Sequence, residues 1–132
     1  MRAFLVGLSL LSLAACGSSS TGPDGQAVIG GVFTLTSVDG KSTFPVAFAD
    51  SSLKSGTLTV TDSGWTQLTI VLYASGGNPA GDTLTQGGGW VTSESNLTLY
   101  DYSNTTAYTG TFTPTSISLT TKTATVLGYT KQ

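Results

Sequence analysis

The feature that most constrains the fold of this chain is a two-residue alternation that recurs from residue 31 to the end. Apolar side chains alternate with threonine, serine or glutamine in short runs, and glycine, proline, aspartate or asparagine separates the runs. This period is that of a β-strand with two different faces, and no stretch shows sustained helical spacing. The pattern predicts about eight strands, at residues 32–38, 56–60, 65–73, 89–93, 97–102, 106–112, 116–120 and 123–130.

The alternation also predicts which face of the sheet is buried. The apolar positions expected to point inward are Phe33, Leu35, Leu58, Val60, Leu68, Ile70, Leu72, Leu97, Leu99, Ile117 and Leu119. Because no helix is predicted to cover this face, the sheet must close into a barrel or fold over as a sandwich. Short sequential links favour an all-β, antiparallel up-and-down barrel, which also removes open strand edges. A β-sandwich is the alternative.

The first residues have the pattern of an export signal. Met1 and Arg2 precede an apolar run that is shorter than the roughly 20 residues needed to span a bilayer. The run ends in Leu13-Ala14-Ala15-Cys16, which resembles the lipobox of bacterial lipoproteins. The resemblance implies cleavage before Cys16, which then carries the lipid. A simple signal peptide with an incidental cysteine is the alternative.

The chain is accordingly expected to have three parts. Residues 1–15 form a lipoprotein signal peptide, and the glycine- and serine-rich residues 16–29 form a flexible tether. Residues 30–132 are one domain's worth of chain. Several acyl chains give a stable membrane anchor. In the lipoprotein family an aspartate just after the cysteine retains a protein at the inner membrane. Gly17 stands there instead, which favours the outer membrane of a bacterial cell envelope.

Composition limits the chemistry that the chain can perform. It has no histidine and no cysteine besides Cys16, which excludes Ser-His-Asp and Cys-His nucleophile arrangements and zinc sites built on these residues. Charged residues are 9% of the chain and the net charge is -2, so there is no basic stripe for nucleic acid. Asp39, Asp62 and Glu94 fall in expected turns, and Asp101 at a solvated rim. We expect no enzymatic activity, no cofactor and no metal.

Three segments carry a resemblance to a known family. They are "GGVFTLTSVDGK" (30–41), "GGGWVTSESNLTL" (87–99) and "TGTFTPTSISLT" (109–120), which share glycine, an aromatic residue, a turn and paired aliphatic residues. This pattern is similar to that of small bacterial lipocalin-like lipoproteins. The resemblance implies a lipocalin-like barrel that binds a small apolar or amphipathic molecule, with the first inter-strand loop folded over its mouth.

The candidate ligand-binding residues are aromatic: Phe33, Phe44, Phe48, Trp90 and Tyr108. Phe44 and Phe48 lie in the long link between the first two predicted strands, where we expect Phe44 to plug the barrel and Phe48 to act as a lid. The alternative is a barrel filled by its own side chains, in a non-catalytic structural or interaction protein of the envelope. A barrel of about eight strands is wide enough for either. The expected partners are the membrane, through the lipid on Cys16, and a small apolar ligand.

Overall fold

The computed structural model describes residues 29–73 and 76–132. The expected signal peptide, the expected lipidation site at Cys16 and all of the expected tether except its last residue lie outside this range. That last residue, Ile29, is 3% exposed and belongs to the hydrophobic core. A fragment that keeps the whole core therefore begins at or before Ile29. In the described part, no helix is long and apolar enough to cross a membrane.

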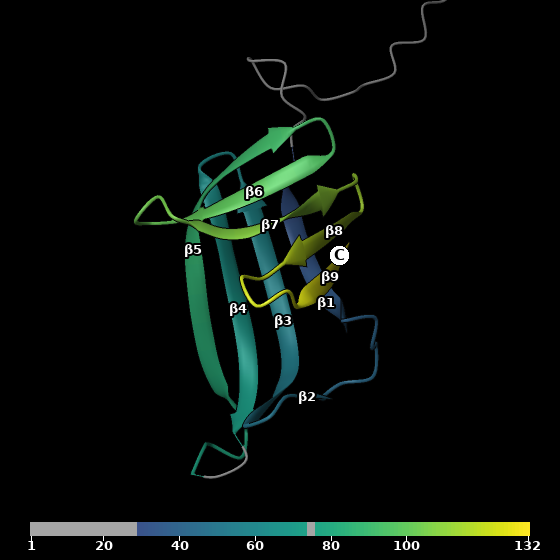
Figure 1. The fold of residues 1–132 in the computed structure, drawn as a ribbon, viewed down its shortest axis with the longest axis vertical. Helices are drawn as coiled ribbons and strands as arrows, with labels where there is room; N and C mark the ends of the chain where they lie inside the picture. The colour runs from purple at the N-terminus through teal and green to yellow at the C-terminus, as the bar shows by residue number, and fades with distance from the viewer. Residues whose placement is uncertain (1–28, 74–75) are drawn as a thin grey trace, which may run out of the picture.

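The described chain forms a single sheet of nine antiparallel strands (Figure 1). The strands are β1 (Gly31–Val38), β2 (Val46–Ala47), β3 (Ser51–Thr61), β4 (Gly64–Tyr73), β5 (Asp82–Ser93), β6 (Asn96–Asp101), β7 (Thr106–Phe112), β8 (Ser116–Thr120) and β9 (Val126–Lys131). Each strand pairs with the next from β2 to β9, and β1 pairs with both β9 and β3. The predicted all-β up-and-down barrel, lipocalin-like in architecture, is confirmed, with β2 as one additional strand.

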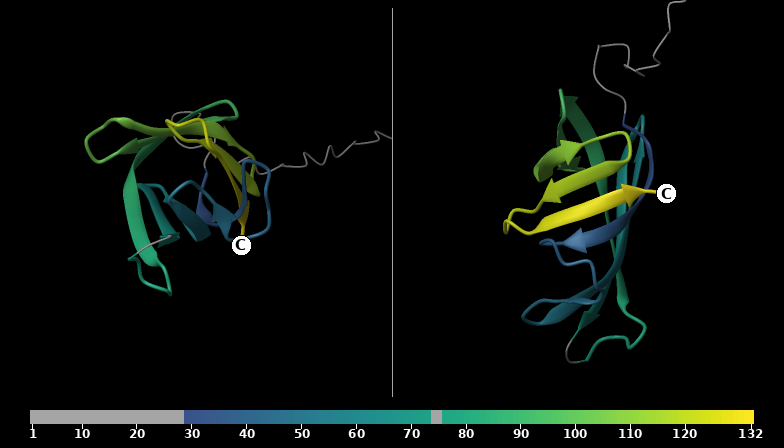
Figure 2. Two further views of the ribbon diagram at one scale, coloured as in Figure 1. Left: turned by 60° about the horizontal axis from the view of Figure 1, so that its bottom comes forward. Right: turned by 90° about the vertical axis from the view of Figure 1, so that its right-hand side faces the viewer.

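Two places in the sheet join three strands. At the first, Phe33 on β1 lies opposite Leu58 on β3 and Lys131 on β9, so β1 joins the last strand to β3 and closes the barrel (Figure 2). At the second, Gly88 on β5 lies opposite Trp65 on β4 and Asp101 on β6. A Cβ atom at position 88 would stand 1.8 Å from the carbonyl oxygen of Tyr100. Only glycine permits this approach, and β5 passes from β4 to β6 there.

Strands β3, β4 and β5 are longer than β6 to β9 and extend beyond them at one end of the barrel (Figure 1). The sequence pattern predicted only residues 56–60 of β3 and 89–93 of β5. The missed half of β5, residues 82–88, contains a single large apolar residue, so it carries no alternation to detect. The missed start of β3 contains a register shift between Leu53 and Ser55, which interrupts the period of two.

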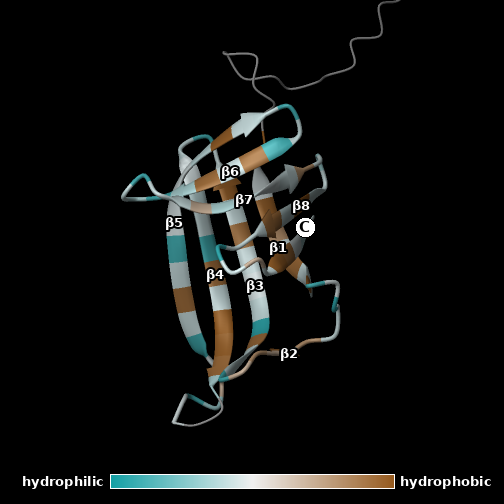
Figure 3. Ribbon diagram, in the orientation of Figure 1, coloured by the Kyte–Doolittle hydropathy of each residue, from teal (hydrophilic) through white to brown (hydrophobic). Residues whose placement is uncertain are grey.

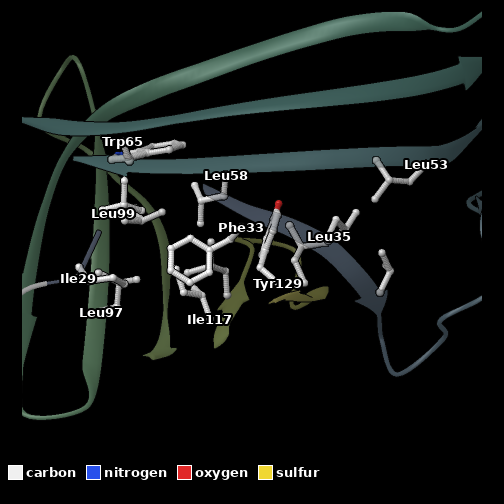
Figure 4. Close-up of a cluster of buried hydrophobic side chains, with 14 of the residues drawn as sticks. Ile29, Phe33, Leu35, Leu53, Leu58, Trp65, Leu97, Leu99, Ile117 and Tyr129 are labelled. Carbon is white, nitrogen blue, oxygen red and sulfur yellow. The ribbon is translucent and has the colours of Figure 1, made fainter. Parts of the chain in front are cut away.

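A hydrophobic core lies inside the barrel (Figure 4). Its buried apolar side chains are Ile29, Phe33, Leu35, Val38, Val46, Leu53, Leu58, Val60, Trp65, Val71, Leu97, Leu99, Ile117, Leu119, Leu127 and Tyr129. The predicted inward positions on β1, β3, β6 and β8 are all among them. Alternation therefore identified the buried face correctly on four strands.

On β4 the predicted face was wrong. Leu68, Ile70 and Leu72 were expected inside, but Leu68 is 45% exposed and the other two are only partly buried. Figure 3 shows the lower half of β4 as largely apolar. The inward positions of this strand are instead taken by Trp65 and Gln67, each nearly fully buried.

The register of β4 explains this reversal. Trp65 lies opposite Val60 and Gln67 opposite Leu58, both of which point into the core. The indole Nε1 of Trp65 also donates a hydrogen bond to the carbonyl oxygen of Tyr100 at 2.9 Å. A shift of one residue would place the leucines inside but would expose this tryptophan. The bulk of Trp65 and its hydrogen bond thus keep Trp65 inside the barrel. Leu68, Ile70 and Leu72 lie on the other face of β4 as a result.

Candidate functional site

A network of uncharged polar side chains crosses the interior of the barrel. Gln67 on β4 is 3% exposed, and its Nε2 donates a hydrogen bond to the hydroxyl of Tyr129 on β9. The hydroxyl of Tyr108 on β7 lies 2.8 Å from Oε1 of the same glutamine. Burying an amide without hydrogen bonds costs several kcal/mol, roughly 2–7 depending on the reference state. Both ends of the Gln67 amide are bonded, so this polar group is tolerated inside the barrel.

The network continues to the surface through Gln86 on β5. Its Oε1 lies 2.6 Å from the hydroxyl of Tyr108, and its side chain is exposed. Tyr108 has one hydroxyl proton and faces the Oε1 atoms of both glutamines, so it donates to one of them at a time. A continuous path of amide and hydroxyl groups therefore runs from the buried Gln67 to solvent.

Both tyrosines of the network are held in their neutral form. Burial raises the pKa of Tyr129 well above its usual range, against the opposing effect of the hydrogen bond from Gln67. Burial likewise raises the pKa of Tyr108, again opposed by its hydrogen bond with Gln67. The polar groups in this part of the barrel are consequently uncharged at neutral pH.

A cavity of about 220 Å³, here called the inner cavity, lies against this network. Its walls combine apolar side chains with amides and hydroxyls, and no lining residue carries a charge. The lining residues are Leu35, Phe48, Leu53, Gln67, Thr69, Leu84, Gln86, Tyr108, Thr121, Thr125, Leu127 and Tyr129. It can therefore surround an apolar group and offer hydrogen bonds at one side.

A second, larger space of about 540 Å³, here called the lateral groove, opens on the side of the barrel. It is lined by Trp65, Thr85, Gln86, Gly87, Asp101, Tyr102, Ala107, Tyr108, Thr121, Lys122 and Thr123. Gln86, Tyr108 and Thr121 belong to both spaces, which therefore meet at these side chains. The Tyr108 ring stands edge-on to Trp65, with centroids 5.7 Å apart and planes at 82°, which fixes its position at the junction.

The structure brings two of the five candidate residues to these spaces. Tyr108 lines both of them, and Phe48 lines the inner cavity with 42% of its side chain exposed. Phe48 therefore lies at the edge of the cavity, and its role as a lid stays a prediction.

The other three candidates lie elsewhere in the barrel. Phe33 is 1% exposed within the core, and Phe44 and Trp90 are partly buried against it. The indole Nε1 of Trp90 donates to the carbonyl oxygen of Thr61 at 2.8 Å, next to the β3–β4 turn. None of the three lines the inner cavity or the lateral groove. Their positions are those of packing residues.

Sequence reasoning missed Gln67, Gln86 and Tyr129. For Gln67 the sequence did contain a signal. Trp65 stands two residues before it, and residues two apart on a strand share a face, so an inward Trp65 implies an inward Gln67. Setting the register of β4 from its largest residue would have turned Gln67 inward. For Gln86 no such signal exists, since its half of β5 shows no alternation.

Asp101 lies at the rim of the lateral groove, as expected, and serves a turn. Its Oδ1 accepts hydrogen bonds from the backbone N–H and hydroxyl of Ser103, at 3.0 and 2.6 Å, and from the backbone N–H of Thr105 at 2.9 Å. These bonds, of which that from the Ser103 hydroxyl has the largest effect, lower the pKa of Asp101 below its usual value.

Within residues 29–73 and 76–132, no group of three or more His, Cys, Asp or Glu side chains could hold a metal ion.

Comparisons with protein-family models, with curated proteins and with solved structures found no match to this chain. The chemistry of the site is therefore judged from its geometry. An uncharged cavity with apolar walls, amides and neutral phenols is suited to holding a neutral molecule.

Proposed function

We propose that the barrel binds a small, uncharged amphipathic molecule in the inner cavity. The observation that carries this proposal is the meeting of an apolar wall and the glutamine–tyrosine network in one space. An eight-stranded barrel is just wide enough to hold one small ligand. An apolar cavity of about 150 Å³ in another protein accommodates benzene. The inner cavity, at about 220 Å³, suits a molecule of that order of size.

The lining also favours a class of ligand. Leu35, Leu53 and Leu127 would contact its apolar part, and amides and hydroxyls would bond its polar group. A ligand carboxylate or ammonium group would lose its hydration in this cavity without gaining an opposite charge, which is costly. Neutral alcohols, phenols and amides therefore fit the cavity better than fatty-acid anions or amines.

The proposal is tested with 1-naphthol, a fluorescent probe that is neutral at pH 7. Thr69 lines the inner cavity from β4, and Thr66 lies exposed on the outer face of the same strand. Thr69→Phe fills the cavity, so we expect it to lower the affinity for 1-naphthol at least tenfold. Thr66→Phe adds the same ring outside and should leave the affinity within twofold of the parent.

Two results would count against ligand binding. One is a parent protein that does not bind 1-naphthol up to its solubility limit, and the other is equal affinity in both variants. Either would favour the alternative function, that of a non-catalytic structural or interaction protein of the envelope.

The first residues of the chain, which lie outside the described range, add a cellular location to the proposal. The lipobox-like sequence supports an exported lipoprotein, anchored through Cys16 in the outer membrane of a bacterial envelope. The absence of histidine supports a role without catalysis. Expression of the full chain with an alkyne-bearing fatty acid should label the parent and leave Cys16→Ser unlabelled. Equal labelling of both proteins would exclude Cys16 as the lipid attachment site.

A further inference from the structure

One edge of β5 is unpaired over half of its length. Residues 82–87 pair with β4 on one side, through a regular register from Val71↔Asp82 to Gln67↔Gln86. On the other side, β6 ends at Asp101, opposite Gly88, and no other described strand continues along β5. Figure 1 shows this part of β5 as the outermost strand of the long sheet. The barrel therefore exposes a free strand edge beside the lateral groove.

The register of the β5–β6 hairpin shows which residues of β5 direct their backbone N–H and C=O groups toward this edge. Its two-residue turn has Glu94 at a φ of 55° with Ser95 at negative φ, as in a type II′ turn. The flanking pair, Ser93 and Asn96, is then a hydrogen-bonded pair, and such pairs recur at every second residue. Odd-numbered residues of β5 thus direct their N–H and C=O groups away from β4. Below the end of β6, these groups belong to Thr83 and Thr85.

This edge carries none of the devices that usually prevent strand pairing. Edges are commonly blocked by lysine, proline or a bulge. Residues 83–87 contain no lysine and no proline, and their register with β4 has no shift. The lateral groove borders the edge at Thr85, Gln86 and Gly87, and leaves room for the side chains of an added strand. The backbone is thus arranged to accept another extended segment.

We propose that the free edge of β5 binds an extended peptide segment of a partner protein, added as a strand and flanked by basic residues. Backbone hydrogen bonds to Thr83 and Thr85 would supply the pairing, as in other cases of strand addition. The charges favour basic flanks, because Asp82 stands at one end of the edge and Asp101 at the other. Lys122, on the turn between β8 and β9, also borders the groove and interacts electrostatically with Asp101, so Asp82 is expected to contribute more to the attraction of a basic residue than Asp101 does.

The same charges argue against a second copy of this chain as the occupant. Two-fold pairing of this edge places either Leu84 or Thr85 on the symmetry axis. With Leu84 on the axis, Asp82 of each copy lies opposite Gln86 of the other, two positions from Asp101; with Thr85 on the axis, it would collide with Asp101, which already occupies that side of Gly88. Like charges would then meet at both ends of the pairing. A lysine-flanked peptide would place opposite charges at the same positions.

The test uses a fluorescein-labelled peptide, acetyl-KTVTVTK-amide, and its twin with glutamate in place of both lysines. Thr85→Pro removes one N–H from the free edge, and proline is tolerated where that group faces solvent. Thr85→Ala keeps the N–H and is the matched control. By fluorescence anisotropy, we expect the lysine peptide to bind at least tenfold more tightly than its twin. Thr85→Pro should weaken its binding at least tenfold, and Thr85→Ala by less than twofold.

Several outcomes would overturn the proposal. They are a lysine peptide that does not bind the parent at millimolar concentration, equal binding of the two peptides, and equal binding by Thr85→Pro. A dimer in sedimentation experiments that Thr85→Pro abolishes would assign the edge to a second copy instead. If Thr85→Pro does not fold, a lysine peptide N-methylated on the amides that face β5 tests the same bonds with the parent protein. Thr85 does not line the inner cavity, so 1-naphthol binding reports a separate property.

Discussion

The two ends of the barrel differ in what fills them. The packed end is closed by six side chains that are almost completely buried: Phe33, Leu58, Leu97, Leu99, Ile117 and Leu119. The cavity end holds Gln67, Tyr108 and Tyr129, and encloses a space that is open to Phe48 and Gln86. Figure 4 shows Leu97 and Leu99 beside Trp65, then Phe33, Leu58 and Ile117 between Trp65 and Tyr129, with Leu35 and Leu53 beyond them.

Unequal strand lengths account for the difference. At the packed end, β6, β7 and β8 face β1 and β3, so both walls contribute aliphatic side chains. At the cavity end, β3, β4 and β5 extend further than β6 to β9, and the opposite wall is short, formed by residues of β7, β9 and the β8–β9 turn. Side chains there have fewer neighbours, and polar groups can be hydrogen-bonded instead of packed. A barrel built from strands of unequal length can therefore combine a solid core with a binding site.

The largest expected contrast comes from one phenylalanine at each end. Phe33→Ala should destabilise the domain by about 3–5 kcal/mol, the cost of truncating a fully buried phenylalanine. Phe48→Ala should cost less than about 1 kcal/mol, because much of this side chain is already in solvent. Urea unfolding of both variants measures the difference. Similar losses of stability at the two positions would contradict the division of the barrel into two ends.

A second contrast concerns the network. Gln67→Leu leaves the hydroxyl of Tyr129 without its partner, so we expect a loss of about 1–3 kcal/mol. Tyr108 keeps its contact with Gln86 and should contribute little to this loss. Adding Tyr129→Phe should recover most of the stability, since both members of the bond are then apolar. Additive effects in a double-mutant cycle would show that the two residues are not coupled.

The stability of the cavity end should also depend on alkaline pH. The unfolded chain releases a tyrosine proton near pH 10, whereas burial raises the pKa of folded Tyr129 above that value. The folded state then binds more protons, so stability is full below pH 10 and falls as pH rises above it, by up to about 1.4 kcal/mol per unit. Tyr129→Phe should flatten this decline in urea midpoints between pH 9 and 11. An unchanged slope in the variant would assign the decline to other groups.

The smallest effect is expected at the rim of the groove. The pKa of Asp101 is lowered from the ordinary value of 3.8, so its carboxylate stabilises the fold above pH 3.8, and this contribution is lost as the pH falls below that value. Asp101→Asn should therefore be less stable than the parent at pH 7 and indistinguishable from it at pH 2.5. If the variant were still less stable than the parent at pH 2.5, the contribution of Asp101 to stability would not come from its charge.

The sequence predicted the packed end far better than the cavity end. Alternation on β1, β6 and β8 follows from one face being wholly apolar, so Phe33, Leu99 and Ile117 were placed correctly. At the cavity end the inward face is itself mixed, and Gln67 inside with Leu68 outside reverses the pattern. The free half of β5 shows no alternation, because it is half-exposed and paired on one side. A period of two can be detected only where one face of a strand is apolar and the other polar. The two faces of β4 and of the first half of β5 differ least, and these strands line the inner cavity.

The most direct test of this account is a methyl-resolved NMR titration of the protein with 1-naphthol. The account predicts that the methyl signals of Leu35, Leu53 and Leu127 shift, and that those of Leu97 and Leu99 do not. Binding would then be confined to the cavity end. Shifts confined to Leu68 and Ile70 would place the probe on the outer face of β4, and shifts at Leu97 and Leu99 would show that the packed end is not closed. Either result would contradict the claim that one barrel holds a solid core and a separate binding cavity.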